Sequence, residues 1–267
     1  MLKLYKKMGE TPLECLERWK KANPEHKNTK MTYAGRLDPM AEGELLVLLG
    51  EECKEKEKYL GLDKEYEFEV LFGFQTDTYD VLGFPHLALQ ALSKLGITLN
   101  PHLALGALSG VISEYDVAGH RERIERFLEK IRGKQTQTYP PFSSKTIGGK
   151  PLFELTKKKG QSKGQLPERE IEIYEADFIK SYWIKGRDLK ADIFKRVLMV
   201  RGDFRQEEIL QRWEKVLKGR EQERFLISKF KVVCSSGTYV RGLVNSLSER
   251  INYPAVTFWI KRTKIFV

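Results

Sequence analysis

The carboxylate of Asp38 lies in a segment whose neighbours restrict its backbone. Pro39 fixes its own φ and limits the residue before it, while Gly35 and Gly43 permit conformations that other residues avoid. Such a segment cannot readily form plain helix or strand, and loops of this kind present side chains for chemistry. Spacing alone favours a simpler interpretation, an Asp-Pro turn before a strand that begins at Leu45. Asp38 is therefore a catalytic candidate that needs support from elsewhere in the chain.

Three other polar segments contain side chains that could act beside this carboxylate. Lys64-Glu65-Tyr66 begins a strand and offers a tyrosine that could stack on a nucleobase. The segment 234–241 is a polar loop running into a helix, where Arg241 in the first turn could reach a carboxylate. The segment 76–83 has the composition of a hydrogen-bonded turn. Taken singly, a strand tyrosine, a surface arginine and a turn are the commoner meanings of these patterns.

The histidines and cysteines of this chain show none of the spacings that are typical of metal sites or catalytic triads. They are scattered along the chain as His26, His86, His102, His120, Cys15, Cys53 and Cys234. This distribution predicts no disulfide framework, no zinc pair and no histidine-centred triad. We therefore expect no metal and no other cofactor, and a chemistry that depends on carboxylates, tyrosine and arginine.

The excess of positive charge predicts a polyanionic partner. Lysine and arginine number 47 against 37 aspartates and glutamates in 267 residues, so the net charge is +10. No apolar run approaches the roughly 18 residues of a membrane span, and the N-terminus lacks the apolar core of a signal peptide. These features favour RNA or DNA over a membrane surface and predict a cytoplasmic protein.

Hydrophobic periodicity predicts the elements that must position these side chains. Aromatic and β-branched residues alternate with polar ones from Tyr66 to Phe74, which predicts a strand with one buried face. Further strands are expected at Leu45–Leu49, Glu170–Lys185 and Phe225–Val233. Helices are expected from Thr11-Pro12 onward and at 87–95, 101–108, 119–132, 151–159, 206–218 and 240–251. Because strands and helices do not alternate regularly, we expect an α+β fold with a mixed, largely antiparallel sheet and flanking helices and loops.

Four segments match the motifs of one known family in both composition and order. Residues 35–45 match Gly-x-Leu-Asp-Pro-x-Ala-x-Gly-x-Leu at every specified position, and residues 64–66 match Lys-x-Tyr. Residues 76–83 match Thr-Asp-Thr-x-Asp-x-x-Gly, and residues 234–241 match Cys-Ser-x-Gly-Thr-Tyr-x-Arg. The chain therefore resembles the bacterial tRNA pseudouridine synthase B (TruB) family, whose archaeal and eukaryotic relatives are guide-dependent. Because segments 150–154 and 260–263 also fall in family order, the resemblance covers almost the whole chain.

A second family shares part of the first motif. The run 35–38, Gly-Arg-Leu-Asp, is also similar to the ribosomal-RNA pseudouridine synthases of the small-subunit type. Asp38-Pro39 and the Tyr239-x-Arg241 motif favour the tRNA family. Because both families share one catalytic core, the resemblance implies the reaction class more firmly than the substrate.

The resemblance implies a tRNA pseudouridine-55 synthase. Such an isomerase breaks the N-glycosidic bond of the T-loop uridine, rotates the uracil and rejoins it to the ribose through carbon five. The implied catalytic residues are Asp38, Arg241, which favours the ionised carboxylate, and Tyr66, which stacks on the flipped base. The residues implied to bind substrate are Tyr33, Lys64, Tyr239, Ile260, Lys261 and Arg262. Lys163 and the run Lys157–Lys159 are further phosphate candidates, although that run could equally stabilise a helix C-terminus.

The chain departs from the family pattern at three places. Tyr33 stands where the tRNA family usually has histidine, two residues before the motif glycine. The segment around 190–224 is expected to be an insertion, and four residues follow Lys261-Arg262-Thr263. We therefore expect residues 1–267 to form a single pseudouridine synthase catalytic domain, without the separate C-terminal RNA-binding (PUA-type) domain of many relatives.

The expected partner is the T stem-loop of tRNA, bound by a monomer that needs no protein partner. Two alternatives stay open at this point: a synthase for ribosomal or another structured RNA, and a non-catalytic RNA-binding or RNA-folding protein with the same fold. The joint presence of Asp38, Tyr66 and Arg241 argues against the non-catalytic protein, because binding alone does not need that trio.

Overall fold

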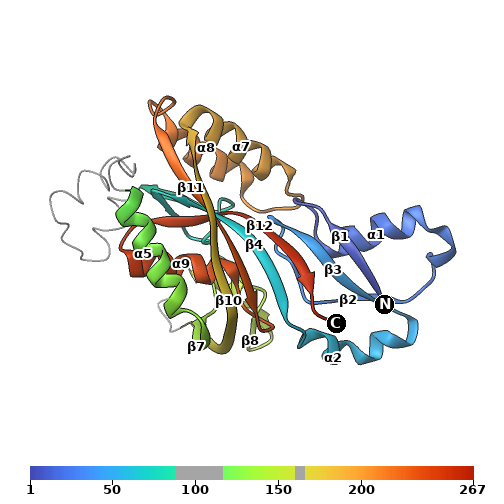
Figure 1. Cartoon of the computed structure of the whole chain (residues 1–267). Coiled ribbons are helices and arrows are strands. Elements are labelled where there is room, and N and C mark those ends of the chain that lie inside the picture. Colours follow the sequence, from blue (N-terminus) through green and yellow to red (C-terminus); the bar gives the residue numbers. More distant parts are fainter. Residues whose placement is uncertain (88–116, 160–165) are drawn as a thin grey trace.

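The computed structural model describes residues 1–87, 117–159 and 166–267 (Figure 1). The helices expected around 87–95 and 101–108 therefore fall almost entirely outside the described residues. Within the described ranges, no helix combines the length and the apolar composition needed to cross a bilayer.

One eight-stranded sheet organises these residues. Its order is β1-β3-β12-β4-β11-β10-β7, with β2 paired to β3. The strands are β1 (Leu2–Lys6), β2 (Met31–Ala34), β3 (Ala41–Leu49), β4 (Lys64–Phe72), β7 (Gly133–Thr138), β10 (Glu168–Lys185), β11 (Arg224–Cys234) and β12 (Ala255–Ile265). Only the β3–β12 pair is parallel among these neighbours. The predicted α+β fold with a mixed, largely antiparallel sheet is confirmed.

The alternating segment at the centre of this sheet forms β4, but it ends earlier than predicted. Gly73 has a φ of +97°, a conformation that L side chains rarely adopt, and it separates β4 from the short β5 (Phe74–Thr76). Strand β5 pairs with β6 (Pro85–Leu87) in a small second sheet, and β8 (Thr146–Ile147) pairs with β9 (Lys150–Pro151) in a third. The predicted strand from Tyr66 to Phe74 is thus divided at its glycine.

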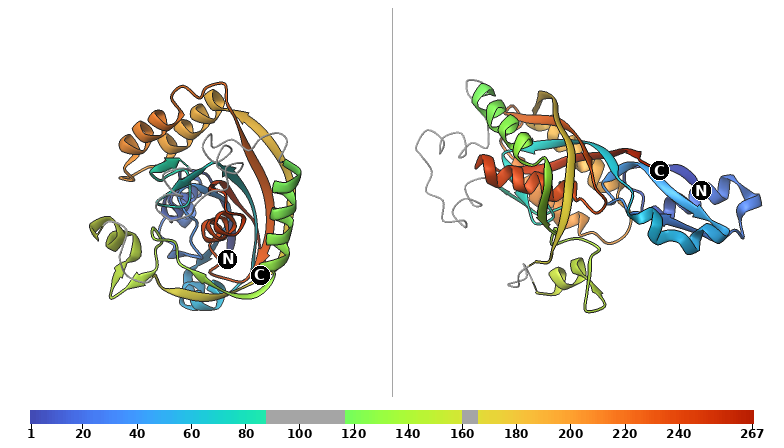
Figure 2. Two further views of the ribbon diagram at one scale, coloured as in Figure 1. Left: turned by 90° about the vertical axis from the view of Figure 1, so that its left-hand side faces the viewer. Right: turned by 60° about the horizontal axis from the view of Figure 1, so that its bottom comes forward.

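Two pairs of helices cover different sides of the long strands β10 and β11 (Figure 1). Helices α5 (Val117–Lys130) and α9 (Val240–Ile251) pack on alternate residues of β4, among them Phe68 and Phe72. Helices α7 (Gly186–Met199) and α8 (Gln206–Leu217) form a hairpin against the opposite face, and the two further views keep this hairpin apart from α5 (Figure 2). Helices α5, α8 and α9 agree with prediction within two residues at each end, whereas α7 was not expected.

The N-terminal part of the chain forms a smaller unit around β1, β2 and β3. Thr11 begins α1 (Pro12–Ala22) with a capping box: its hydroxyl accepts from the Glu14 amide at 3.2 Å, and its own amide donates to the Glu14 carboxylate at 2.7 Å. Cys15 and Leu16 of this predicted helix pack on Leu45 and Val47 of β3. The remaining elements are η1 (Pro24–His26), η2 (Gly50–Glu55), α2 (Lys56–Leu60) and α6 (Leu152–Lys159).

The parallel β3–β12 pairing depends on Gly43. This residue has a φ of +115°, and a Cβ added there would lie 2.1 Å from the Arg262 carbonyl oxygen. Gly43→Ala should therefore lower the free energy of unfolding by roughly 2–5 kcal/mol, from backbone strain plus overpacking. Urea unfolding measures this loss.

Gly133→Ala is the matched control, because Gly133 has a φ of +88° but nothing within 4 Å of an added Cβ. It should cost only the backbone strain, about 1–2 kcal/mol. Equal losses in the two variants would contradict the steric explanation for Gly43.

Candidate active site

Two buried cations hold the loop that carries Asp38, which connects β2 to β3. Arg262 of β12 is 1% exposed and donates to the carbonyls of Glu44 at 2.7 Å, Arg36 at 3.3 Å and Gly35 at 3.4 Å. Lys6 of β1 approaches from the other side. Its ammonium donates to the carbonyls of Ala41 at 2.5 Å, Lys7 at 3.1 Å and Pro39 at 3.4 Å. The loop backbone is therefore fixed by charge-assisted hydrogen bonds from two neighbouring strands.

Burial changes the proton affinity of Lys6. Burial lowers the pKa of Lys6 to about 8, while the nearby Asp38 carboxylate opposes that change. Lys6 was not among the predicted site residues, because a lysine in a short N-terminal strand has no pattern that distinguishes it from a surface lysine.

Lys64 and Arg262, which were predicted to contact RNA phosphates, are buried and donate to backbone carbonyls of the protein. Lys64 is 5% exposed, and its ammonium donates to the carbonyls of Leu60 at 3.1 Å and of Leu62. Arg262 is occupied by the Asp38 loop in the same way. Both side chains support the backbone near the site, since a buried cation needs acceptors within the protein.

Arg241 connects three segments that are far apart in the sequence. Only 3% of this residue is exposed, and its Nε donates to Oδ2 of Asp38 at 2.7 Å. Its Nη1 donates to the Thr78 carbonyl at 2.8 Å, and its Nη2 donates to the Phe142 carbonyl at 3.2 Å. The predicted Asp38–Arg241 pair is present, and the guanidinium is fixed on three sides around it.

The segment 76–83 is the predicted turn, and it also brings a second carboxylate to Arg241. Asp80 accepts from the Thr78 hydroxyl at 2.7 Å and from the Leu82 amide at 3.0 Å. Its Oδ2 lies 3.8 Å from Nε of Arg241. Burial raises the pKa of Asp80 to about 6, although the Arg241 charge opposes the increase.

The start of α9 is held in place by a glutamine that the sequence analysis did not identify. Gln137 of β7 is buried, and its amide group donates to the Tyr239 carbonyl at 3.0 Å and accepts from the Tyr239 amide at 2.8 Å. The Tyr239 ring packs edge-on against Tyr139, with ring centroids 5.5 Å apart. Because Tyr239 immediately precedes α9, this contact fixes where Arg241 enters the site.

A cavity of about 350 Å³ opens beside the Asp38–Arg241 pair. Its lining is largely apolar, and it combines the Asp38 loop, the 76–83 turn, the start of α1 and the α7–α8 connection. Asp38 is the accessible member of the ion pair, since 35% of its side chain is exposed against 3% for Arg241. The arrangement presents a carboxylate to a ligand of limited size in a largely apolar cavity.

The other predicted site residues lie at different distances from this cavity. Tyr33 lines it, with the Lys56 ammonium 5.5 Å from the ring centroid. Tyr66 and Ile260 are buried in the core cluster beneath the Asp38 loop. Leu37 of that loop belongs to the same cluster. Burial raises the pKa of Tyr66. Tyr66 is not among the described residues that line the cavity.

The remaining candidates are peripheral or cannot be placed. Lys261 is half-buried on β12, with its ammonium 5.9 Å from the Tyr5 ring centroid. The side chains of Lys157–Lys159, and Lys163 entirely, lie outside the described residues. Across the described ranges, no three His, Cys, Asp or Glu side chains are grouped as metal ligands would be.

Comparison with known proteins identifies relatives across most of the chain. Residues 23–94 and 94–193 match the sequence model of a family described as TruB family pseudouridylate synthase (N terminal domain). The tRNA pseudouridine synthase B of Lactobacillus acidophilus is 28% identical over 233 residues, and that of Aquifex aeolicus is 29% identical over 178 residues. These alignments cover 87% and 67% of this chain but 58% and 51% of the two relatives. The chain therefore spans little more than half the length of these relatives.

A chain in the crystal structure of a Cbf5-Nop10-Gar1 complex has a similar fold. The TM-score is 0.50 at 15% sequence identity, and the alignment covers 98% of this chain and 48% of that chain. This likeness supports the fold assignment.

The raised pKa of Asp80 predicts a pH-dependent contribution to stability. Between its ordinary value of 3.8 and about 6, the folded state keeps a proton that the unfolded chain has released. The stabilisation from Asp80 is therefore present below about pH 4 and is lost as pH rises through about 6. The stability of wild type minus that of Asp80→Asn, which cannot titrate, should fall between pH 4 and pH 7 in urea unfolding. A difference that stays constant with pH would contradict this assignment.

Proposed function

The chain belongs to the TruB family of pseudouridylate synthases, and from that membership we propose that it converts the T-loop uridine of tRNA, position 55, to pseudouridine. The observation that carries the proposal is the pair of Asp38 and Arg241 facing a cavity of about 350 Å³. The 2.7 Å contact holds the carboxylate against a buried guanidinium at the edge of a largely apolar cavity. The similar relatives are named tRNA pseudouridine synthase B, which supports tRNA as the substrate.

The proposed reaction is an isomerisation that needs no oxidant, reductant or second substrate. The bond between the ribose C1′ and N1 of uracil breaks, and a bond between C1′ and C5 forms. The proton on C5 is lost and N1 gains one, so the atoms and charges of the base balance. Each route for these steps requires Asp38 as the ionised carboxylate, whether it attacks the ribose, adds to the base or removes a proton.

The neighbouring residues have supporting roles in this proposal. Tyr66 and Ile260, in the core beneath the Asp38 loop, pack against the flipped uracil once it enters. Tyr33 at the cavity wall contacts an adjacent nucleotide, in the position where the tRNA family usually has histidine. Tyr239, two residues before Arg241, and Lys261, directly before Arg262, contact the RNA around the target.

The working form that we propose is a cytoplasmic monomer that acts on the T stem-loop. The excess of lysine and arginine, 47 against 37 acidic residues, favours association with the phosphate backbone. We treat residues 1–267 as one catalytic domain, with the segment around 190–224 as an insertion.

Asp38→Asn tests the central assignment. The variant should form no detectable pseudouridine in single-turnover assays on an unmodified tRNA transcript, because asparagine cannot supply the ionised carboxylate. Its dissociation constant for tRNA should stay within about threefold of wild type, since phosphate contacts dominate affinity. Asp188→Asn is the matched control, because Asp188 is an exposed residue of α7 that pairs with Arg187.

The outcomes separate the alternatives. Product from the Asp38→Asn variant would remove Asp38 from the catalytic role. Wild type that binds and refolds tRNA without forming product would favour the non-catalytic RNA-folding protein. Product on ribosomal RNA alone would favour the other class of synthase.

Arg241→Lys tests the buried partner. Lysine keeps the charge, but a compact ammonium cannot reproduce the planar fork by which the guanidinium reaches three acceptors from separate segments. The single-turnover rate should fall about 100-fold or more, with little change in tRNA affinity because Arg241 is 3% exposed. Arg250→Lys, in the exposed last turn of the same helix, is the control. Equal losses in rate and affinity would instead make Arg241 a direct RNA contact.

A further inference from the structure

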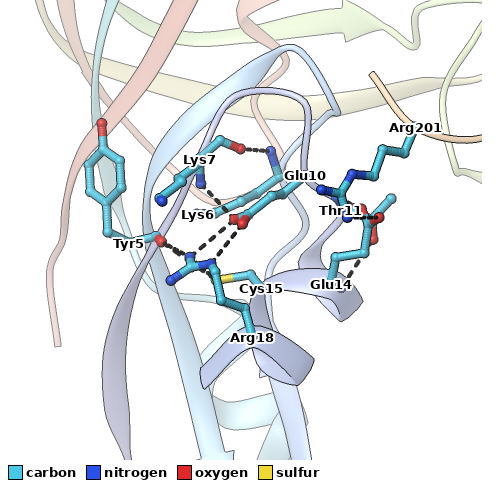
Figure 3. Close-up of polar contacts among 9 residues, drawn as sticks. All are labelled: Tyr5, Lys6, Lys7, Glu10, Thr11, Glu14, Cys15, Arg18 and Arg201. Carbon is cyan, nitrogen blue, oxygen red and sulfur yellow. Dashed lines mark hydrogen bonds and ion pairs between the residues drawn. The ribbon is translucent and has the colours of Figure 1, made fainter. Parts of the chain in front are cut away.

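The connection between α7 and α8, residues 200–205, forms one wall of the cavity that contains Asp38. Asp203, Phe204 and Arg205 line the cavity opposite the start of α1. Arg201 of the same connection lies 3.6 Å from Glu14, so the loop also reaches α1 directly (Figure 3). The family model ends its match at residue 193, and this connection therefore lies outside the matched residues.

Arg205 reaches from this connection to the turn that carries Asp80. Its Nη1 donates to Oδ2 of Asp77 at 2.9 Å, and only 22% and 12% of the two side chains are exposed. The guanidinium also lies over two aromatic rings, 4.1 Å from the Phe84 centroid and 4.7 Å from the Phe142 centroid. A partly buried guanidinium with a carboxylate partner and two ring faces is strongly fixed in position.

The two segments that Arg205 contacts are also those that receive hydrogen bonds from Arg241. Phe142 offers its ring to Arg205 and its carbonyl to Arg241, at 3.2 Å. Asp77 pairs with Arg205, and the next residue, Thr78, offers its carbonyl to Arg241 at 2.8 Å. A shift of either segment would therefore move an acceptor of the guanidinium that holds Asp38.

The hairpin is well suited to hold Arg205 still. Arg205 has a φ of +63°, a left-handed conformation that non-glycine residues rarely adopt, immediately before α8. Trp213 of α8 is fully buried and donates to the Val81 carbonyl at 3.1 Å, which joins the helix to the same turn. Gln206 closes the connection by donating to the carbonyls of Val200 at 2.9 Å and Gly202 at 2.7 Å.

We propose that Arg205 is a positioning residue for the Asp38–Arg241 pair, acting through Phe142 and the Asp77–Thr78 turn. This inference rests on the proposed pseudouridine synthase function. It assigns a catalytic contribution to the α7–α8 hairpin, beyond the residues that the family motifs identify. In this proposal Arg205 acts through those two segments and not on the reacting atoms.

Arg205→Asn is the primary test, because asparagine tolerates a left-handed backbone and removes only the long side chain. Its single-turnover rate on a tRNA transcript should fall about 10- to 100-fold, since small misplacements at a reacting centre have effects of this size. The dissociation constant for tRNA should stay within about threefold of wild type, and the unfolding temperature should change little. Arg205→Lys, which keeps the charge facing Asp77, should recover part of the rate.

Two further variants sharpen the test. Asp77→Asn should reproduce the loss, and the double variant Asp77→Asn/Arg205→Asn should lose no more than either single change, because both break one contact. Arg212→Gln is the matched control: Arg212 also lies over the Phe84 ring, at 4.0 Å, but is 44% exposed and pairs with Glu208 away from the cavity. Its rate should equal that of wild type.

The results distinguish this proposal from the function on which it rests. Wild type that forms no pseudouridine overturns the proposed function and the positioning role together. Active wild type with an unchanged rate in Arg205→Asn overturns the positioning role alone. A rise in the tRNA dissociation constant that matches the loss of rate overturns it as well, because Arg205 would then be a substrate contact.

Discussion

A buried guanidinium must find hydrogen-bond acceptors inside the protein, and this requirement organises the site around Arg241. Its acceptors come from the Asp38 loop, the 76–83 turn and the loop that contains Phe142, so one side chain joins three otherwise independent segments. Removing a charge of this kind from water costs several kcal/mol unless partners are present. The same contacts that satisfy Arg241 therefore set the position of Asp38.

Other buried charged groups around the Asp38 loop also have their hydrogen-bond partners within the protein. Lys6 and Arg262 are also buried, and they donate to backbone carbonyls on both sides of the Asp38 loop. Asp80 gives Arg241 a second negative neighbour, and burial raises the pKa of this carboxyl group to about 6. The loop thus carries an accessible carboxylate among buried groups that find their hydrogen-bond partners within the protein, which suits the preorganised site that the proposed reaction needs.

Local patterns predicted most of the elements well. The helix 240–251 was predicted with the bounds that it has, because Val240, Leu243, Val244 and Leu247 fall on one helical face. Helix α7 was not expected, although Leu189, Ile193 and Val197 have helical spacing. The strand predicted from Tyr66 to Phe74 is divided because Gly73 adopts a backbone conformation that periodicity does not report.

The sequence by itself determined the α+β class, the catalytic candidates Asp38 and Arg241, and the resemblance to one enzyme family, because these depend on residue types and short spacings. Residue types and spacing could not show that Lys64 and Arg262, two predicted phosphate contacts, are buried and donate to backbone carbonyls. Nor did they identify Lys6, Gln137 or Arg205. Only the tertiary structure decided those roles, because burial and pairing join residues as far apart as Asp38 and Arg241, which are 203 positions distant along the chain.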